Sequence, residues 1–177
     1  MKLFATTLLA LSLNAVAAVD LAKSEFKWTG KKITGDAHYG LVPLKSGSLV
    51  VEKDVIKGGE FVIDLAALSV GDLTGEYKGK LEGHLKSGDF FNVEKFPTAT
   101  LKVKSVKGDK VTADLTIKGK TNPVTFDVKK DGTSYSGKLV FDRTKFDMIY
   151  NSGNFFKDLG DKVINNDVTL EFKVVQN

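Results

Sequence analysis

The sequence predicts an all-β fold with about eight antiparallel strands. The first observation is a two-residue period of apolar and polar side chains, which gives each strand one buried face and one solvent-exposed face. The second is the turn chemistry between these runs, such as Lys107-Gly108-Asp109 and Asp131-Gly132. The third is size, because 177 residues, 42% of them apolar, suffice for one domain with a real core.

Eight runs carry the alternation. In the clearest, from Val111 to Ile117, every second residue is apolar and the residues between are Thr or Asp. A sheet of this size closes either as a sandwich or as a barrel, and periodicity leaves both open. The inward residues of the eight runs are, in chain order, Phe26 and Trp28; Leu49 and Val51; Phe61, Ile63 and Leu65; Ala99, Leu101 and Val103; Val111, Ala113, Leu115 and Ile117; Val124, Phe126 and Val128; Tyr135, Leu139 and Phe141; and Val168, Leu170, Phe172 and Val174.

Two segments break the strand pattern. From Gly75 to Lys86 the apolar residues Tyr77, Leu81 and Leu85 recur every four positions, which predicts one face of a short helix. Two internal glycines weaken that helix, so it needs contacts with the rest of the fold.

The second segment, residues 148–166, is rich in Asn and Gly and predicts a long irregular connection, a class of loop that is usually functional or disordered. Its adjacent Phe155 and Phe156 predict that part of it packs onto the core.

Residues 1–18 have the pattern of a Sec-type signal peptide. Lys2 gives a positive start, an apolar run from Leu3 to Leu13 is too short to span a bilayer, and small residues predict cleavage after Ala17 or Ala18. The mature domain is then 19–177, located in the periplasm or released outside the cell. It has no integral membrane segment, although transient membrane contact stays open, as does the choice between a monomer and a homodimer.

Composition excludes several functions. The absence of cysteine removes thiol nucleophiles and iron–sulfur clusters. The formal net charge is +4, but Arg143 is the single arginine among 26 basic residues, and these are spread along the chain, which disfavours nucleic-acid binding. No nucleotide-binding or hydrolase motif is present, so neither an enzyme, a cofactor nor a metal site is expected. The enzymatic alternative is a hydrolase that combines His84 with Ser87 and Asp89.

Four segments carry a more specific pattern: His84–Asn92, Lys95–Leu101, Asp114–Val124 and Phe141–Phe146. In order and spacing they resemble the signature blocks of the YceI family of bacterial secreted lipocalin-like proteins. The resemblance implies an extended eight-stranded antiparallel barrel with a short helix packed near one end. It also implies an elongated apolar interior that takes up polyisoprenoid lipids, including isoprenoid quinones. Asp147 departs from the glycine often found after the last block.

The expected function is therefore a carrier that sequesters a long apolar lipid. The alternative is a stress-related or interaction barrel whose core is filled by its own side chains. For His84, a hydrogen bond to the lipid head group competes with a structural role. Arg143 is expected to pair with a carboxylate or, alternatively, a pyrophosphate, and Asp89 to cap the turn before Phe90. The predicted ligand-binding residues are Phe26, Trp28, Phe61, His84, Phe90, Phe91, Phe126, Phe141 and Phe146.

Overall fold

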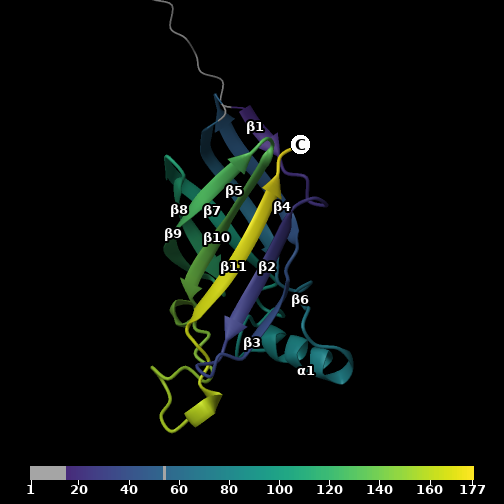
Figure 1. The fold of residues 1–177 in the computed structure, drawn as a ribbon, viewed down its shortest axis with the longest axis vertical. Coiled ribbons are helices and arrows are strands. Elements are labelled where there is room, and N and C mark those ends of the chain that lie inside the picture. Colours follow the sequence, from purple (N-terminus) through teal and green to yellow (C-terminus); the bar gives the residue numbers. More distant parts are fainter. Residues whose placement is uncertain (1–14, 54) are drawn as a thin grey trace, which may run out of the picture.

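A computed structural model describes residues 15–53 and 55–177, which form a curled antiparallel sheet with one short α-helix (Figure 1). The sheet order is β1-β4-β5-β7-β8-β9-β10-β11-β2-β3-β6. All pairings between strands are antiparallel. The strands are β1 (Ala15–Ala18), β2 (Glu25–Lys31), β3 (Ala37–Leu41), β4 (Leu44–Glu52), β5 (Val55–Asp64), β6 (Ser69–Val70), β7 (Thr98–Lys107), β8 (Lys110–Ile117), β9 (Lys120–Asp131), β10 (Ser134–Asp142) and β11 (Asp167–Val175).

The described residues form eleven strands, where the sequence predicted about eight. All eight predicted runs are confirmed as strands, and β1, β3 and β6 are additional. Strand β3 was missed because only Gly40 of its five residues is buried, so it has no alternation of apolar and polar side chains. Only Val42 and Pro43 separate it from β4, and proline cannot donate the hydrogen bond that would continue the ladder. Because β3 pairs with β2 while β4 pairs with β5, these two strands join two parts of the sheet and curl it into a barrel.

A second junction lies at the other end of the barrel. Val19 forms an isolated antiparallel bridge with Gln176. Beside it, the backbone N–H of Asn177 donates to the carbonyl oxygen of Ala18, at 3.0 Å. These contacts tie the segment that follows β1 to the end of β11.

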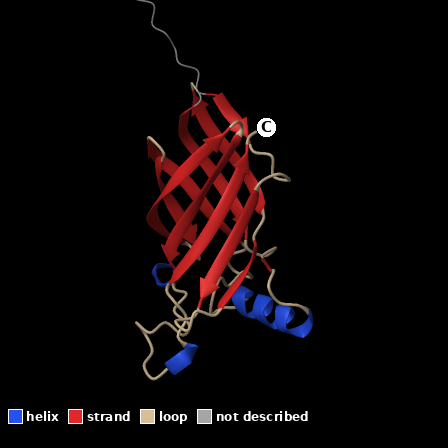
Figure 2. Ribbon diagram, in the orientation of Figure 1, coloured by secondary structure: helices blue, strands red, loops and turns tan. Residues whose placement is uncertain are grey.

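The helix α1 (Gly75–Lys86) lies near the opposite end of the barrel (Figure 2), with the predicted bounds. Leu81 and Leu85 are half-buried against the core, but Tyr77 is 73% exposed, so its predicted place on the packed face is wrong. The helix buries no residue completely, because only part of its surface meets the barrel rim.

The connection between β10 and β11 contains two short 3₁₀ helices, η1 (Arg143–Phe146) and η2 (Gly160–Lys162). Part of this connection packs onto the core as predicted, through buried Met148 and half-buried Tyr150 and Ile164. The residues that do so are not Phe155 and Phe156, which are 55% and 44% exposed. The backbone N–H groups of both residues donate to the carbonyl oxygen of Ser152, and this turn directs the chain away from the barrel.

Most of the predicted signal peptide, residues 1–14, lies outside the described residues, and its last four residues form β1. Within the described part of the chain, no helix combines the length and apolar character that crossing a bilayer requires.

Candidate functional site

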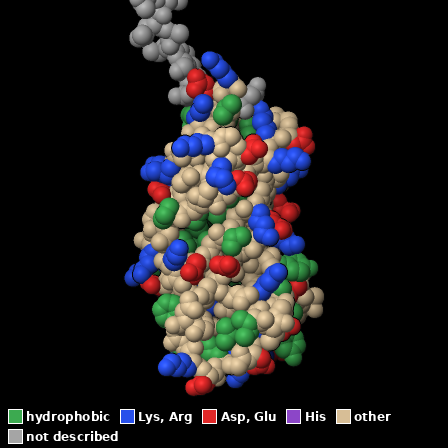
Figure 3. Space-filling view, turned by 60° about the vertical axis from the view of Figure 1, so that its left-hand side comes forward, with side chains coloured by type: hydrophobic (Ala, Val, Ile, Leu, Met, Phe, Trp, Pro, Cys, Tyr) green, Lys and Arg blue, Asp and Glu red, His purple; other side chains and the backbone are tan. Residues whose placement is uncertain are grey.

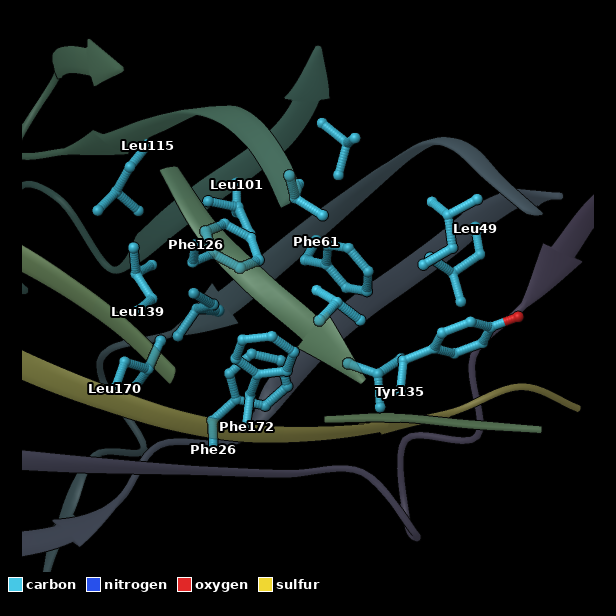
Figure 4. Close-up of a pocket in the computed structure, with 16 residues that line it drawn as sticks. Phe26, Leu49, Phe61, Leu101, Leu115, Phe126, Tyr135, Leu139, Leu170 and Phe172 are labelled. Atoms are coloured by element: carbon cyan, nitrogen blue, oxygen red, sulfur yellow. The ribbon is translucent and has the colours of Figure 1, made fainter. Parts of the chain in front are cut away.

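The middle of the barrel contains a small apolar cavity of about 40 Å³ (Figure 4). Its walls come from opposite sides of the sheet, with Phe26 on β2, Phe61 on β5 and Phe126 on β9 pointing toward one another. The sixteen lining residues are Phe26, Leu49, Ile56, Phe61, Ile63, Leu101, Val103, Val111, Leu115, Phe126, Val128, Tyr135, Leu139, Leu170, Phe172 and Val174.

Only one of these side chains carries a polar atom. The hydroxyl of Tyr135 points away from the phenylalanine rings (Figure 4) and donates to Oε1 of Gln176, at 3.4 Å. Because every other lining group is hydrocarbon, the cavity offers a ligand contact area without a directional bond.

Three phenylalanine rings in the lining of the first cavity pack against one another. Phe172 stacks on Phe26, with ring centroids 6.1 Å apart, and meets Phe126 edge-on at 5.5 Å. Gly137 makes room for this cluster, since a Cβ at that position would stand 2.7 Å from Cζ of Phe172. A volume of about 40 Å³ holds roughly three water-sized groups, so a long chain enters only if these rings move.

A larger cavity, of about 120 Å³, lies between α1 and the barrel. Its inner wall is apolar, with Trp28 from the sheet facing Leu81 and Leu85 of the helix. Charged and polar residues also border it, unlike the first cavity, but the surface that they present to the space is apolar. The lining residues are Trp28, Gly30, Lys31, Lys32, Asp36, His38, Leu81, Leu85, Phe90, Phe91, Arg143, Met148, Ile164, Asn165 and Val168.

The two cavities follow one another along the barrel. On β2, Phe26 lines the first and Trp28, the next residue on the same face, lines the second. On β11, Leu170 and Val168 make the same step. Because alternate residues of a strand share a face, one track of inward side chains connects both spaces.

Arg143 is buried, with 1% of its surface exposed, and it lines the second cavity. Its guanidinium donates to three backbone carbonyl oxygens, those of Met148, Ile164 and Asn165. The expected carboxylate partner is therefore wrong for this structure. Burial lowers the pKa of Arg143 and the charge of Asp142 opposes that effect, but a guanidinium stays charged at neutral pH. The side chain holds the 148–166 connection against the barrel.

His84, near the end of α1, packs its ring edge-on against Phe90 and Tyr150, with centroids 5.1 Å and 4.6 Å away. Its Nε2 lies 3.2 Å from Oδ2 of Asp89. Ser87 instead donates its hydroxyl hydrogen to the backbone carbonyl of His84, at 2.8 Å. The serine hydroxyl is therefore turned away from the imidazole that would activate it in a hydrolase.

The turn after α1 is capped by Ser87 and not, as expected, by Asp89. The carbonyl oxygen of Ser87 accepts the N–H groups of Phe90 and Asn92, and its hydroxyl oxygen accepts the N–H of Asp89. Serine reaches these groups because it precedes them directly, whereas the Asp89 carboxylate faces His84.

Phe141 and Phe146 are buried and meet edge-on at 5.7 Å, but they line neither interior cavity. They line a surface pocket of about 160 Å³ between β9 and β10. The pairing of these two strands covers only residues 134–138 of β10 and 127–131 of β9, so the sheet opens beyond it. The predicted set thus divides in three: Phe26, Phe61 and Phe126 in the first cavity, Trp28, Phe90 and Phe91 in the second, and His84, Phe141 and Phe146 outside both.

At the rim of the second cavity, Nδ1 of His38 lies 2.7 Å from Oδ2 of Asp72. Partial burial acts to raise the pKa of Asp72, but hydrogen bonds from the Tyr39 N–H and the His38 ring outweigh it, so that pKa is lowered. His38 joins the candidate site here, although as an isolated histidine it gave no sequence signal. In the described part of the chain, no three His, Asp or Glu side chains form a group that could hold a metal ion.

Comparison with solved structures shows the same fold in other bacterial proteins. BcnA of Burkholderia cenocepacia superposes with a TM-score of 0.70 over 90% of this chain and 99% of its own, at 24% identity. A polyisoprenoid-binding domain from Saccharophagus degradans, implicated in plant cell wall breakdown, gives a TM-score of 0.66 over 93% of this chain and 99% of its own, at 16% identity. At these identities the likeness concerns the fold.

Sequence comparison identifies the family. UPF0312 proteins of Staphylococcus aureus are 55% identical over 53 residues, which are 30% of this chain and 31% of theirs. The match thus spans about a third of the length of these curated relatives. The sequence model of the YceI-like domain matches residues 18–176. Apart from the first three residues of β1, the residues that build the curled sheet, α1 and both cavities lie inside this match, and the chain belongs to the YceI-like family.

Proposed function

We propose that this chain is a carrier that sequesters a long apolar lipid, a polyisoprenoid or an isoprenoid quinone, inside the barrel. The observation that carries the proposal is the hydrocarbon lining of the first cavity, whose single polar atom, on Tyr135, is directed elsewhere. Membership of a family with a polyisoprenoid-binding structural neighbour supports it, and supports a binding protein over an enzyme.

The free energy of such binding comes from removing the lipid from water. Each buried methylene contributes about 0.8 kcal/mol, so a few isoprene units exceed the cost of association. We propose that the tail contacts Phe26, Phe61 and Phe126 in the first cavity. In the second, it contacts Trp28, Phe90 and Phe91.

Loading requires the ring cluster of Phe26, Phe126 and Phe172 to open, because the present cavity is too small for a chain. These rings have no polar group to unpair, so their rotation costs packing but no hydrogen bond. In this proposal His38, Lys31 and Lys32, which border the apolar second cavity, donate to a head group that stays outside it.

The small size of the first cavity also favours a second candidate, a barrel with a filled core and no ligand. In that case the ring cluster is simply the packed centre of the domain, and the protein acts through its surface.

We also propose that residues 1–18 act as a signal peptide, and that the domain from Val19 onward works in the periplasm or after release from the cell. Cleavage after Ala18 removes β1, which pairs with residues 48–51 of β4, and leaves that edge of β4 open.

Purification from the periplasm followed by organic extraction and mass spectrometry tests the carrier directly. We expect an isoprenoid lipid in the extract and uptake of added ubiquinone by stripped protein. Phe126→Asp places a carboxylate among hydrocarbon side chains and should abolish uptake, whereas Val140→Asp, on the exposed barrel wall, should retain it. If native preparations contain no lipid and the stripped protein takes up no ubiquinone, the barrel with a filled core and no ligand is the correct interpretation.

A further inference from the structure

One end of the molecule exposes three large apolar side chains. Ile33, in the turn between β2 and β3, is 57% exposed, and Phe155 and Phe156 are 55% and 44% exposed. Figure 1 shows that the 148–166 connection projects from the barrel at the end away from the C-terminus. In Figure 3, hydrophobic side chains gather at this end beside charged ones.

The two segments that carry these residues are in contact. The backbone N–H of Ile33 donates to the carbonyl oxygen of Val163, at 3.1 Å, and Lys32 forms a bridge with Ile164. A Cβ at Gly153 would stand 3.5 Å from the side chain of Val163. The turn that leads to Phe155 and Phe156 therefore also lies beside Val163. Ile33, Phe155 and Phe156 thus belong to one surface, which we call the tip.

The tip is held in this form by buried polar contacts. Ser152, with 0% exposure, donates its hydroxyl hydrogen to Oδ1 of Asn166 at 2.7 Å, and its carbonyl oxygen accepts the N–H groups of both phenylalanines. Arg143 ties the flanking segments to the barrel through three carbonyl oxygens. The exposed rings are therefore a built feature, and exposed apolar clusters of this kind mark interaction surfaces.

The charges around the tip fit a phospholipid surface. Lys31, Lys32, Lys157 and Lys162 are exposed, and among the described residues none of them takes part in an ion pair. Such lysines can lay their alkyl stems along the tip and direct their ammonium groups to lipid phosphates. The tip also carries Asp36, Asp158 and Asp161, so its positive excess is small and insertion of the apolar side chains provides most of the attraction.

The position of the tip next to the second cavity also favours a phospholipid bilayer as the partner. Lys31, Lys32 and Ile164 line that cavity while their neighbours Ile33 and Val163 belong to the tip segments. We infer that the tip docks this protein onto a lipid bilayer, with Phe155, Phe156 and Ile33 inserted among the acyl chains and the second cavity facing the membrane. The inference extends the proposed function, since a lipid carrier must meet the bilayer that supplies or receives its ligand.

Flotation with vesicles of phosphatidylethanolamine and phosphatidylglycerol, in a 3:1 ratio, tests the docking. We expect the protein to float with the vesicles, and the double variant Phe155→Ser/Phe156→Ser to bind at least about tenfold more weakly. The matched control is Val55→Ser/Val140→Ser, which removes two side chains that are 47% and 44% exposed and lie outside the tip. This control should bind as the unaltered protein does.

A spectroscopic probe shows whether residue 156 inserts. The only tryptophan, Trp28, is 8% exposed, so in Phe156→Trp the new indole is the exposed reporter. Its emission should shift to the blue on addition of vesicles, and brominated lipids should quench it. Equal vesicle binding by the Phe155→Ser/Phe156→Ser variant, or an indole that stays in water, overturns the inference.

A protein partner is the competing occupant. If the protein ignores vesicles but forms a dimer that the two serine substitutions abolish in sedimentation experiments, the tip is an interface between copies and the inference is wrong. Loading of ubiquinone from dilute solution, without vesicles, should be the same for the unaltered protein and the serine variant. If neither the unaltered protein nor the serine variant takes up ubiquinone, the proposed carrier function is overturned. The vesicle flotation result then decides the membrane docking independently.

Discussion

The indole Nε1 of Trp28 donates a hydrogen bond to the backbone carbonyl oxygen of Ser69, 3.1 Å away. Gly40 lies directly beside this bond: a Cβ at that position would overlap the Ser69 carbonyl and stand 2.9 Å from Nε1 of Trp28. Residue 40 on β3 pairs with Val70 on β6. This close contact fixes the short β6 strand beside β3, where the chain turns toward α1.

Gly40→Ala should therefore displace β6 and lower the free energy of unfolding by about 2–3 kcal/mol, because backbone atoms must move to accept the methyl group. Gly58→Ala is the matched control, since its Cβ would meet Val50 at an ordinary 3.6 Å and should change stability by less than about 1 kcal/mol. Urea unfolding measures both. Equal values for the two variants would show that β6 is not fixed by this contact.

Phe126→Ala should lower the free energy of unfolding of the lipid-free protein by about 3–5 kcal/mol, because it enlarges the first cavity. Adding geranylgeraniol should recover part of that loss, since a ligand that binds only the folded state and fills the space stabilises it. Phe141→Ala removes an equally buried ring that lines neither interior cavity. The free energy of unfolding that Phe141→Ala loses should not be recovered when geranylgeraniol is present. Equal recovery by both variants would contradict the conclusion that the ligand fills the first cavity.

Arg143→Lys should lower the free energy of unfolding by about 2–3 kcal/mol, because one ammonium group cannot reach three carbonyl oxygens in place of the guanidinium fork. Hydrogen exchange of residues 148–166 should become faster, while exchange in β8 stays unchanged. Lys145→Ala, on the exposed side of η1, should stay within about 0.5 kcal/mol of the unaltered protein. Unchanged exchange in the connection would show that other contacts hold it.

The helix α1 should be the easiest ordered segment to open, because it buries no residue fully and contains Gly79 and Gly83. Neither glycine has a positive φ or any atom within 4 Å of an added Cβ. Replacing both by alanine should stabilise the helix by about 0.8–1 kcal/mol per site and slow ubiquinone exchange more than it changes affinity. Gly88→Ala, past the helix end and equally open, should leave the exchange rate unaltered. Stopped-flow fluorescence of ubiquinone release distinguishes these outcomes.

Periodicity predicted the eight long strands because each has one dry face, as the burial of Val111, Ala113, Leu115 and Ile117 shows. The same reasoning identified Phe26, Phe61 and Phe126 as inward residues. It failed where contacts between distant segments decide. Phe155 and Phe156 are exposed because Ser152 and Asn166 fix their turn, and no local pattern contains that pairing.

Arg143 shows the same limit. A single arginine in a lysine-rich chain suggested an acidic partner, but its three acceptors are backbone carbonyls, which have no residue-type signal. The presence of two interior cavities also escapes the sequence, because it depends on how side chains of distant strands and of α1 pack together.

The isolated bridge between Val19 and Gln176 brings the two ends of the domain together at the side of the barrel away from the tip. A short linker could therefore join them, and new ends could be opened in the β7–β8 turn at Gly108, which has a positive φ and open space around it. Such a circular permutant would keep every strand pairing of the barrel while changing the order in which the strands leave the ribosome. The molecule can equally be tethered to a surface by both joined ends, leaving the opposite end of the barrel unobstructed.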